Sequence, residues 1–394
     1  MRRRKINKIS ILLSLLLVFL TVVTTSCHRS EMRDMVSEHL EWPAYLHDSK
    51  NSATVDIETG LPEKIVWRKR YQAKGSEWPI SNVIIYHGNV LVYTADGFIR
   101  ALDVDSGTED WKVGGFEMPL NMAFSGTRGK IVGFGLFLFS LSIDGGSLYY
   151  PTIKEDLQKK NIPREPPTPI MASTPITPAG NRIYFASVDK LLYSISTANW
   201  RVIWKAEMVG GTGQPQQAPC VANGMVFVPT LDRIYCFNKD NGNTLWTKPF
   251  AIDSSIVFSE NRIYCGSTSG TVFCLDPLDG SVIWSRELSG GILKAPLVLK
   301  DRVIVSAGPV YCLRKDNGEP LWQNDRLGEA WTPLAATRSF CLFGDGNGNI
   351  YFINQKSGDV MKTFNIPEHP FTVALNKDRV VIGTERGYLF CFGR

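Results

Sequence analysis

The chain has 394 residues, enough for roughly two or three average domains or for one large repeat fold. A hydrophobic fraction of 44% and a charged fraction of 21% exclude a collagen, a coiled coil and a fully disordered chain. The formal net charge is +5, but residues 1–26 carry five basic residues and no acidic one, so the remainder is balanced. A nucleic-acid-binding surface, which needs clustered Lys and Arg, is therefore not indicated.

The N-terminus has the pattern of an export signal. Basic residues up to Lys8 precede an apolar run from Ile9 to Val23, and small residues follow before Cys27. This run is shorter than the about 20 apolar residues that a membrane-spanning helix needs. We therefore predict a signal peptide over residues 1–26, with an uncleaved membrane anchor as the alternative.

This segment resembles the signal peptide of a bacterial lipoprotein. By that resemblance Cys27 is lipidated and becomes the first residue of the mature protein, although Thr24 stands where such signals usually have an apolar residue. His28 follows, where enteric lipoproteins kept in the inner membrane have Asp, so the resemblance favours the outer membrane. Residues 27–62 are polar and weakly patterned, and we expect a lipidated tether and lead-in there.

Residues 63–394 contain an internal repeat. Its clearest copy consists of Ala101, Gly107 and Trp111, with Asp103 in between. Further strong copies are Cys236, Gly242 and Trp246; Cys274, Gly280 and Trp284; and Cys312, Gly318 and Trp322. Weaker copies are Ser140, Gly146 and Tyr150; Ser194, Trp200 and Trp204; and Phe352, Gly358 and Lys362. The third position recurs mostly about every 40 residues, which is the period of a propeller blade with four short strands.

One repeat unit shows its strands directly. β-branched runs at Arg302–Ser306 and at residues 309–314 predict two strands, and a further strand begins at Leu321. Asp316, Asn317 and Gly318 predict a tight turn, because Gly readily supplies the positive φ that such turns need.

The two ends of the repeat complete each other. Cys391 is a first-position residue with no Trp strand after it, and Trp67 belongs to a strand with no partners before it. We therefore predict an all-β fold over residues 63–394. It is an eight-bladed β-propeller of four-stranded antiparallel blades, whose ring is closed by the N-terminal strand joining the C-terminal blade. Closure of this kind removes exposed sheet edges.

Packing explains the motif. An indole buries a large area and its N–H needs a partner, so a small first residue leaves it room and a Gly lets backbone approach closely. Phe352 and Lys362 depart from this pattern together, and we expect the seventh blade to pack differently. The sequence offers no reason for Trp200 at a Gly position.

The small residue, Asp, Gly and Trp at these offsets resemble the tryptophan-docking motif of the PQQ-like β-propeller family. Trp42-Pro43-Ala44-Tyr45 also resembles the lead-in to the first blade of such proteins. The resemblance covers about residues 42–394 and implies the propeller fold. It leaves function open, because one fold hosts many functions.

Eight cysteines occur, and four of them share one position of the repeat. Cys236, Cys274, Cys312 and Cys391 stand in the small first position, where a free thiol acts as a small buried apolar group. Cys265 and Cys274 are the one plausible disulfide pair, since a two-residue turn at Ser269-Gly270 would place them opposite each other. The sequence does not decide whether they are bonded.

Motifs for chemistry are missing from the sequence. Only His87 and His369 lie in the predicted propeller, in different blades, and no CxxC, GxSxG, HExxH or phosphate-binding loop occurs. Quinoprotein alcohol dehydrogenases share the fold, but they typically carry a vicinal Cys-Cys beside their cofactor, which this sequence lacks. We assign no catalytic, cofactor-binding or metal-binding residue, and we expect no cofactor and no enzymatic activity.

Two loops are candidates for partner contact, the Pro-rich residues 151–173 and the Gly- and Gln-rich residues 209–218. The lipoprotein start, short tether and repeats together resemble the propeller lipoproteins of the outer-membrane β-barrel assembly machinery. That resemblance implies a non-enzymatic scaffold, lipid-anchored in the outer membrane and facing the periplasm. Its partners would be proteins, among them a barrel insertase, and not nucleic acid.

Two alternatives stay open at the level of sequence. One is a PQQ-dependent dehydrogenase. The other is an envelope propeller that binds a polysaccharide or a protein unrelated to barrel assembly, for which Trp78 and Trp331 offer aromatic side chains outside the docking positions. The sequence identifies neither the partner-binding residues nor the face that carries them.

Overall fold

The computed structural model describes residues 42, 44, 46–71, 83–94, 96–114, 124–127, 130–134, 138–142, 148–149, 172–211 and 213–394. The chain divides into two compact units, Met1–His39 and Leu40–Arg394, and the second unit holds all of the described strands. Within the described residues, no helix has the length and apolar character that crossing a membrane requires.

The described strands of the second unit form eight four-stranded sheets. The first three sheets are β2 (Ile84–Tyr86), β3 (Asn89–Thr94), β4 (Phe98–Asp103) and β5 (Glu109–Gly114); β6 (Phe124–Thr127), β7 (Lys130–Phe134), β8 (Leu138–Ser142) and β9 (Leu148–Tyr149); and β10 (Thr177–Ala179), β11 (Arg182–Ala186), β12 (Leu191–Ser196) and β13 (Val202–Glu207). The next two are β14 (Cys220–Ala222), β15 (Met225–Pro229), β16 (Ile234–Asn238) and β17 (Thr244–Lys248); and β18 (Val257–Ser259), β19 (Arg262–Gly266), β20 (Thr271–Leu275) and β21 (Val282–Glu287).

The remaining sheets lie toward the C-terminus. They are β22 (Leu297–Val298), β23 (Arg302–Ser306), β24 (Val310–Arg314) and β25 (Pro320–Asn324); β26 (Ala335–Ala336), β27 (Cys341–Gly344), β28 (Asn349–Ile353) and β29 (Val360–Asn365); and β30 (Pro370–Leu375), β31 (Val380–Thr384), β32 (Tyr388–Gly393) and β1 (Lys64–Arg70). We call the last of these the terminal sheet, because it joins both ends of the repeat region. In it β1 runs antiparallel to β32, from the pair Lys64 and Gly393 to the pair Arg70 and Tyr388.

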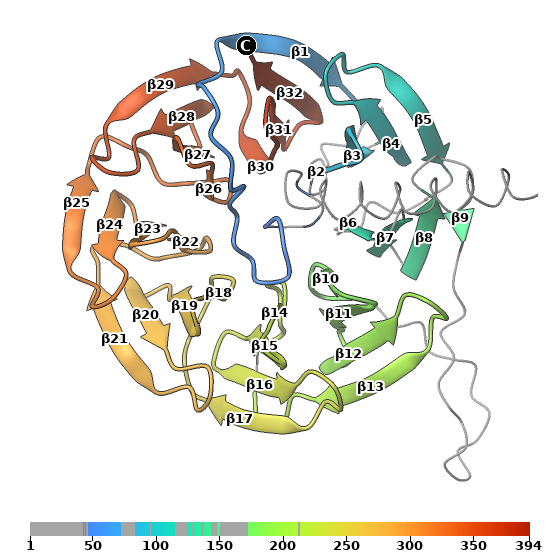
Figure 1. Ribbon diagram of the computed structural model, residues 1–394, viewed down its shortest axis with the longest axis vertical. Coiled ribbons are helices and arrows are strands. Elements are labelled where there is room, and N and C mark those ends of the chain that lie inside the picture. Colours follow the sequence, from blue (N-terminus) through green and yellow to red (C-terminus); the bar gives the residue numbers. More distant parts are fainter. Residues whose placement is uncertain are drawn as a thin grey trace, which may run out of the picture. The chain divides into compact units, whose positions relative to one another are not determined.

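The sheets lie around a common centre, with the first strand of each sheet inside and the fourth at the rim (Figure 1). Inner strands of successive sheets contact one another, and β30 of the terminal sheet contacts β2. The expected fold class, an all-β propeller of four-stranded antiparallel blades, is confirmed. The strands expected from the β-branched runs near residue 305 are β23 and β24.

Burial follows the position of a strand within its sheet. Every residue of β15 is buried, because an inner strand is covered by the neighbouring sheets on both faces, whereas β17 at the rim is mostly exposed or half-buried. Inner strands therefore read as continuous apolar runs and rim strands alternate, as their surroundings require.

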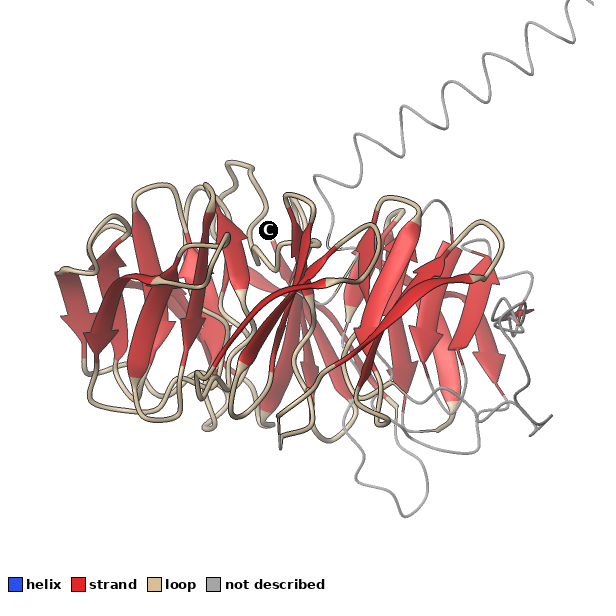
Figure 2. Ribbon diagram, turned by 90° about the horizontal axis from the view of Figure 1, so that it is seen from below, coloured by secondary structure: helices blue, strands red, loops and turns tan. Residues whose placement is uncertain are grey.

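The loops gather on two opposite faces, between which the strands run (Figure 2). Because the strands of a sheet are antiparallel, one face carries the turns from the third to the fourth strand, where the repeat glycines stand; we call it the motif face. The other face carries the turns from the second to the third strand and the connections between sheets, and we call it the connection face.

The lead-in, residues 46–62, crosses the centre of the unit (Figure 1). Its Val55 N donates to Ala336 O at 2.9 Å, and Ala336 N donates to Ala53 O at 3.0 Å. Asn51 Nδ2 donates to Ile256 O at 2.9 Å. The lead-in is thus part of the folded unit, where its polar composition had suggested a tether, because its backbone and its Asn side chain bond to the inner strands.

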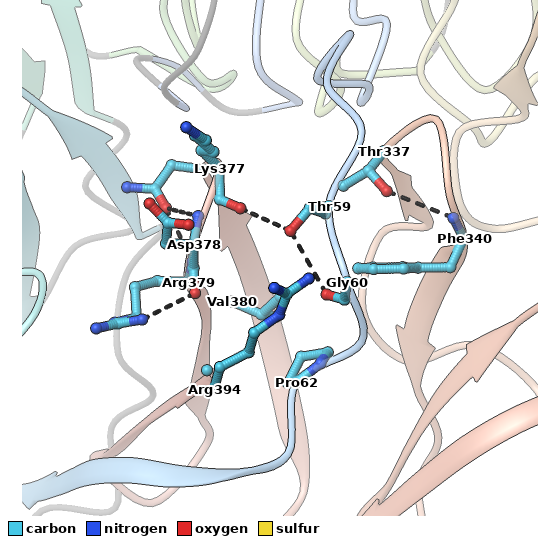
Figure 3. Close-up of a pocket in the computed structure, with 12 residues that line it drawn as sticks. Thr59, Gly60, Pro62, Thr337, Phe340, Lys377, Asp378, Arg379, Val380 and Arg394 are labelled. Atoms are coloured by element: carbon cyan, nitrogen blue, oxygen red, sulfur yellow. Dashed lines mark hydrogen bonds between the residues drawn. The ribbon is translucent and has the colours of Figure 1, made fainter.

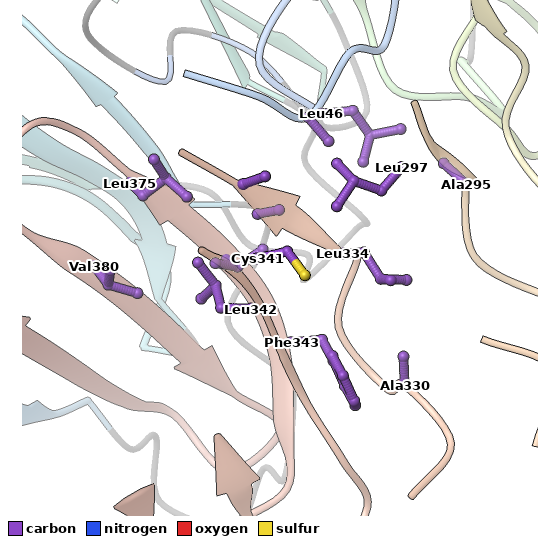
Figure 4. Packing of buried hydrophobic residues seen from close by; sticks show 14 of the residues in the cluster. Leu46, Ala295, Leu297, Ala330, Leu334, Cys341, Leu342, Phe343, Leu375 and Val380 are labelled. Carbon is purple, nitrogen blue, oxygen red and sulfur yellow. The ribbon is translucent and has the colours of Figure 1, made fainter. Parts of the chain in front are cut away.

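Apolar side chains of the lead-in belong to the largest buried cluster. Leu46 is buried and lies close to Leu297, Leu334 and neighbouring residues of three sheets (Figure 4). Trp42, which precedes the lead-in and is nearly fully buried, forms an antiparallel bridge with Ile85 of β2. The lead-in therefore ties together sheets that lie on different sides of the centre.

Candidate functional site

The indoles of the repeat dock on the next sheet along the chain. Nε1 of Trp284 donates to Lys315 O at 3.0 Å, and a Cβ added to Gly318 in the same turn would lie 2.5 Å from Trp284 Cε3. Gly318 has a φ of 72°, which Gly adopts without strain. The same arrangement joins Trp67 to Gly107, Trp204 to Gly242, Trp246 to Gly280 and Trp322 to Gly358.

Within its own sheet each Trp is the cross-strand partner of the small first residue. The pairs are Ala101 with Trp111, Cys236 with Trp246, Cys274 with Trp284, Cys312 with Trp322 and Cys391 with Trp67. The Gly that receives an indole thus belongs to the next copy of the motif, a relation that the spacing within one copy does not reveal. The motif therefore joins each sheet to the next one along the chain.

The topology explains why Lys362 stands at the third position of the motif, where most other copies have Trp. The next sheet is the terminal sheet, whose third and fourth strands come from opposite ends of the chain, so no turn with a Gly connects them. Lys362 Nζ donates instead to Glu63 O, just before β1, at 3.1 Å. Lys362 remains the cross-strand partner of Phe352. This copy packs differently, as expected, because an indole there would have no glycine turn to dock on.

Trp200 also has a structural explanation. It stands at a Gly position and adopts the same left-handed conformation, with a φ of 57°. Its side chain is buried in a cluster with Val132 and Leu138 of the preceding sheet. The indole therefore belongs to an apolar cluster that combines residues of its own sheet and of the preceding one. Gly146 and Tyr150, of the preceding copy of the motif, lie outside the described residues.

The seven cysteines from Cys220 to Cys391 are free and buried. The predicted opposition of Cys265 and Cys274 is wrong, because Cys265 pairs with Phe273 and Cys274 pairs with Tyr264. The hairpin is longer than two residues, since Ser267 N donates to Thr271 O. A shift of one residue places the two thiols on opposite faces of the sheet.

Burial makes these thiols unreactive. It raises the pKa of Cys236, Cys312 and Cys391 to about 12 and that of Cys274 to about 11. A thiol with so high a pKa stays protonated at neutral pH, and the protonated form is a poor nucleophile.

The described residues contain no group of three or more His, Cys, Asp and Glu placed to hold a metal ion. Trp331 is 39% exposed and stacks on His369, with ring centres 5.2 Å apart, so packing accounts for much of its surface. Cys27, Trp78 and residues 151–171 of the Pro-rich loop lie outside the described residues.

A small cavity of about 40 Å³, partly open to solvent, lies on the motif face between the lead-in and the C-terminal strands (Figure 3). Thr59 Oγ1 donates to Lys377 O at 2.7 Å across it, and Phe340 supplies an apolar wall. The guanidinium of Arg394 lies against Gly60, where an added Cβ would be 1.7 Å from Nη2. The cavity marks where the lead-in is fastened to the terminal sheet.

Three exposed apolar side chains gather on the connection face around residues 209–218. Val188 and Leu231 stand in turns from a second to a third strand, and Val209 lies two residues after the end of β13. The loop is held to the turn of Val188, because Gln214 Nε2 donates to Val188 O at 3.2 Å, and to β16, because Tyr235 Oη donates to Val209 O at 3.1 Å. We call Val188, Val209 and Leu231 the loop patch. The sequence indicated the loop but not the two turns that complete it.

Comparison with known proteins agrees with this geometry. The family model described as "Outer membrane protein assembly factor BamB" matches residues 231–393. BamB of Moranella endobia (strain PCIT) is 23% identical over 244 residues, which cover 56% of this chain and 62%, less than two thirds, of that relative. BamB of Yersinia pestis is 20% identical over 295 residues, covering 57% of this chain and 72% of that one.

A solved structure of a BamB protein has the same fold. BamB from Moraxella catarrhalis matches with a TM-score of 0.60 at 16% identity, covering 84% of this chain and 99% of that one. At this identity the match shows the fold alone. Together the comparisons show that the chain resembles BamB propellers of the PQQ-repeat kind.

One relative carries the name of an enzyme. Tetrathionate hydrolase of Acidithiobacillus ferrooxidans (strain ATCC 23270 / DSM 14882 / CIP 104768 / NCIMB 8455) is 20% identical over 185 residues, covering 39% of this chain and 37% of that one. Sequence likeness at this level is therefore shared between an assembly factor and an enzyme, and the function has to be argued from the surface of this chain.

Proposed function

We propose that the protein is a non-enzymatic scaffold of the bacterial cell envelope that binds protein partners in outer-membrane β-barrel assembly. Its likeness to several proteins named BamB supports a role in outer-membrane β-barrel assembly. The single observation that carries partner binding is the loop patch, in which Val209 is 67% exposed although its loop is hydrogen-bonded in place. Exposed apolar side chains on an ordered surface are typical of interaction sites.

The loop patch is preorganised for this role. Gly213 lies against Leu231, where an added Cβ would be 3.0 Å from Leu231 Cβ. Tyr235 Oη and Gln214 Nε2 fix the loop on either side. A partner that docks here does not have to order the loop, and so loses less conformational entropy on binding. The partner we propose is a periplasmic domain of a barrel insertase.

A binding experiment tests the patch. The double substitution Val209→Glu and Leu231→Glu places two charges on the apolar surface, and we expect at least about tenfold weaker binding to the periplasmic domains of the insertase of the same bacterium. Leu278→Glu is the matched control, because Leu278 is 69% exposed on the motif face. Equal binding by the double variant and the control, or no binding by the unchanged protein, would contradict the proposal.

We also propose that Cys27 is lipidated after removal of residues 1–26, and that the protein is held in the outer membrane facing the periplasm. The resemblance of residues 1–27 to lipoprotein signals supports the anchor. In cells fed a radiolabelled fatty acid, the unchanged protein should carry label and move with the outer-membrane fraction. Cys27→Ser should carry none, and equal labelling of both would contradict the anchor.

The scaffold we propose is a closed ring of eight blades. The eight four-stranded sheets, the pairing of β1 with β32 and the contact of β30 with β2 support closure. The docking residues of the repeat serve as its fastenings. A rigid ring of this kind suits a scaffold, because it holds the loop patch in a fixed orientation.

A further inference from the structure

β1 stands out among the rim strands by its charge. It contains Lys64, Arg68, Lys69 and Arg70 and no acidic residue. None of the other fourth strands that the structure describes has more than one basic residue, and β5 has two acidic ones, Glu109 and Asp110. Since the chain beyond residue 26 is balanced in charge, β1 is a local concentration of positive charge.

The cations of β1 have no acidic partner among the described residues, and the guanidinium of Arg70 lies over the ring of Tyr388 on β32, 4.8 Å from the ring centre. Lys64, Arg68 and Arg70 are exposed. Other arginines of the described part do have acidic partners, as Arg338 has in Asp56 at 2.6 Å. The positive charge of β1 therefore faces solvent.

The backbone of β1 is also open on one side. It ends the order of the terminal sheet and pairs with β32 alone among the described strands. Such an edge presents unpaired N–H and C=O groups that another extended chain can bond. Arg68 and Arg70 lie two residues apart and so point to the same face of the strand, about 6.6 Å apart. Acidic residues at alternate positions of an added strand would come opposite them.

We propose that β1 binds an extended acidic segment of a partner protein, which adds to the terminal sheet as a fifth strand. Backbone hydrogen bonds supply part of the affinity, and Arg68 and Arg70 select acidic side chains. This interaction lies beyond the proposed scaffold function and does not involve the loop patch, so either can fail alone. The alternative role of these charges is to prevent another strand from pairing with the edge. A binding experiment distinguishes the two roles, because only the proposed one predicts that an acidic strand binds.

The experiment uses the full chain and three fluorescent peptides of about ten residues. The first has Glu at alternate positions, the second has Gln in their place, and the third keeps Glu but has Pro between, which prevents strand pairing. By fluorescence anisotropy we expect the Glu peptide to bind, with an affinity that falls as salt rises. The Gln and Pro peptides should bind at least about tenfold more weakly.

Substitutions locate the site. Arg68→Glu with Arg70→Glu should weaken binding of the Glu peptide at least about tenfold. Arg201→Glu with Lys205→Glu, the same change of charge at exposed positions beside and within β13, should leave it within about twofold. If the first double variant does not fold, the salt series and the Gln and Pro peptides decide on the unchanged protein.

Three results would overturn the proposal. The first is no binding of the Glu peptide. The second is equal binding of the Glu and Pro peptides, which would mean general charge attraction without strand pairing. The third is that the unchanged protein binds phosphatidylglycerol vesicles but no peptide, and that Arg68→Glu with Arg70→Glu abolishes vesicle binding. This result would mean that β1 contacts lipid.

Discussion

At the scale of single residues, the glycines of the repeat do two separable things. A turn Gly provides a positive φ, and a docking Gly also leaves space for an indole. Gly318 does both, since its φ is 72° and an added Cβ would meet Trp284, whereas Gly308 has a φ of 78° with no heavy atom near an added Cβ. The two glycines therefore separate backbone strain from docking.

Replacing each glycine by Ala measures the difference. Gly308→Ala should cost about 1 kcal/mol in free energy of unfolding, from the left-handed backbone. Gly318→Ala should cost about 2–4 kcal/mol, because the Cβ also displaces the indole of Trp284. Urea unfolding curves of both variants give these values. An equal cost for both would show that the indole is not held by close contact with the glycine.

The buried thiols predict a dependence on alkaline pH. Burial raises the pKa of Cys312 from an ordinary value near 9 to about 12. The folded state therefore favours the protonated thiol, and its contribution to stability is complete below about pH 9 and is lost as the pH rises toward 12. Cys312→Ala removes this group, and Ala is the natural residue at the matching position 101.

Urea unfolding at several pH values checks this expectation. The midpoint for the unchanged protein should fall as the pH rises above about 9, and that for Cys312→Ala should fall less steeply. Since other groups titrate in the same range, the difference between the two slopes is the quantity to compare. Parallel slopes would mean that the thiol is not shielded from water in the folded protein.

At the scale of elements, the lead-in shows how a polar segment becomes part of a core. Asn51 is nearly fully buried, and its Nδ2 donates to Ile256 O at 2.9 Å and to Ala218 O at 3.4 Å. Lys50 O accepts from Phe258 N at 3.0 Å, and Ser49 O accepts from Val221 N at 2.6 Å. Three successive residues thus bond two adjacent sheets, so the lead-in acts as a strap across the inner strands.

Substitution of Asn51 tests the strap. Asn51→Ala should cost about 2–4 kcal/mol, because two buried carbonyl groups lose their donor and the residue has a φ of 58°. Asn261→Ala is the control, since Asn261 has the same φ of 58° in an exposed turn. Its cost should be about 1 kcal/mol. If the two variants unfold at the same denaturant concentration, the lead-in does not stabilise the inner strands through Asn51.

The repeat could be predicted because its signals are local. Trp, Gly and the small residue recur at fixed offsets, and strand runs such as Arg302–Ser306 lie beside their turns. The incorporation of the lead-in into the folded unit could not be predicted, because its partners, such as Ala336, are hundreds of residues away and its own residues are mostly polar. The register at Cys265 was missed because Ser269-Gly270 fits either a two-residue or a longer turn, and only packing selects one.

The candidate site could be predicted only in part. Residues 209–218 stand out by their Gly and Gln, but Val188 and Leu231 are ordinary turn residues until the fold brings them together. The basic residues of β1 are plain in the sequence. Their meaning depends on β1 having a free edge, which follows only from the topology.

At the scale of the whole molecule, the terminal sheet joins the two ends of the repeat region. Trp67 of β1 is buried, and its Nε1 donates to Val104 O of the next sheet at 3.0 Å. On the other side, Lys362 bonds Glu63 O just before β1. β1 is therefore fastened to both of its neighbours, and the proposed ring depends on these contacts.

Removing the indole of β1 tests this dependence. Trp67→Ala should cost about 3–5 kcal/mol in free energy of unfolding and should speed hydrogen exchange of β1 and β32 before that of β15. Trp331→Ala, at a partly exposed Trp outside the repeat, should cost less and should leave exchange in β1 unchanged. Uniform exchange across all sheets after Trp67→Ala would contradict a local opening at the terminal sheet.

The measurement that tests the proposed function most directly is mild crosslinking in native membranes, followed by purification on this protein and identification of the attached proteins. The account predicts recovery of an outer-membrane barrel insertase, its loss with Val209→Glu and Leu231→Glu, and its retention with Leu278→Glu. Purification of the unchanged protein without an insertase, or with glycan-handling proteins in its place, would contradict a role in barrel assembly.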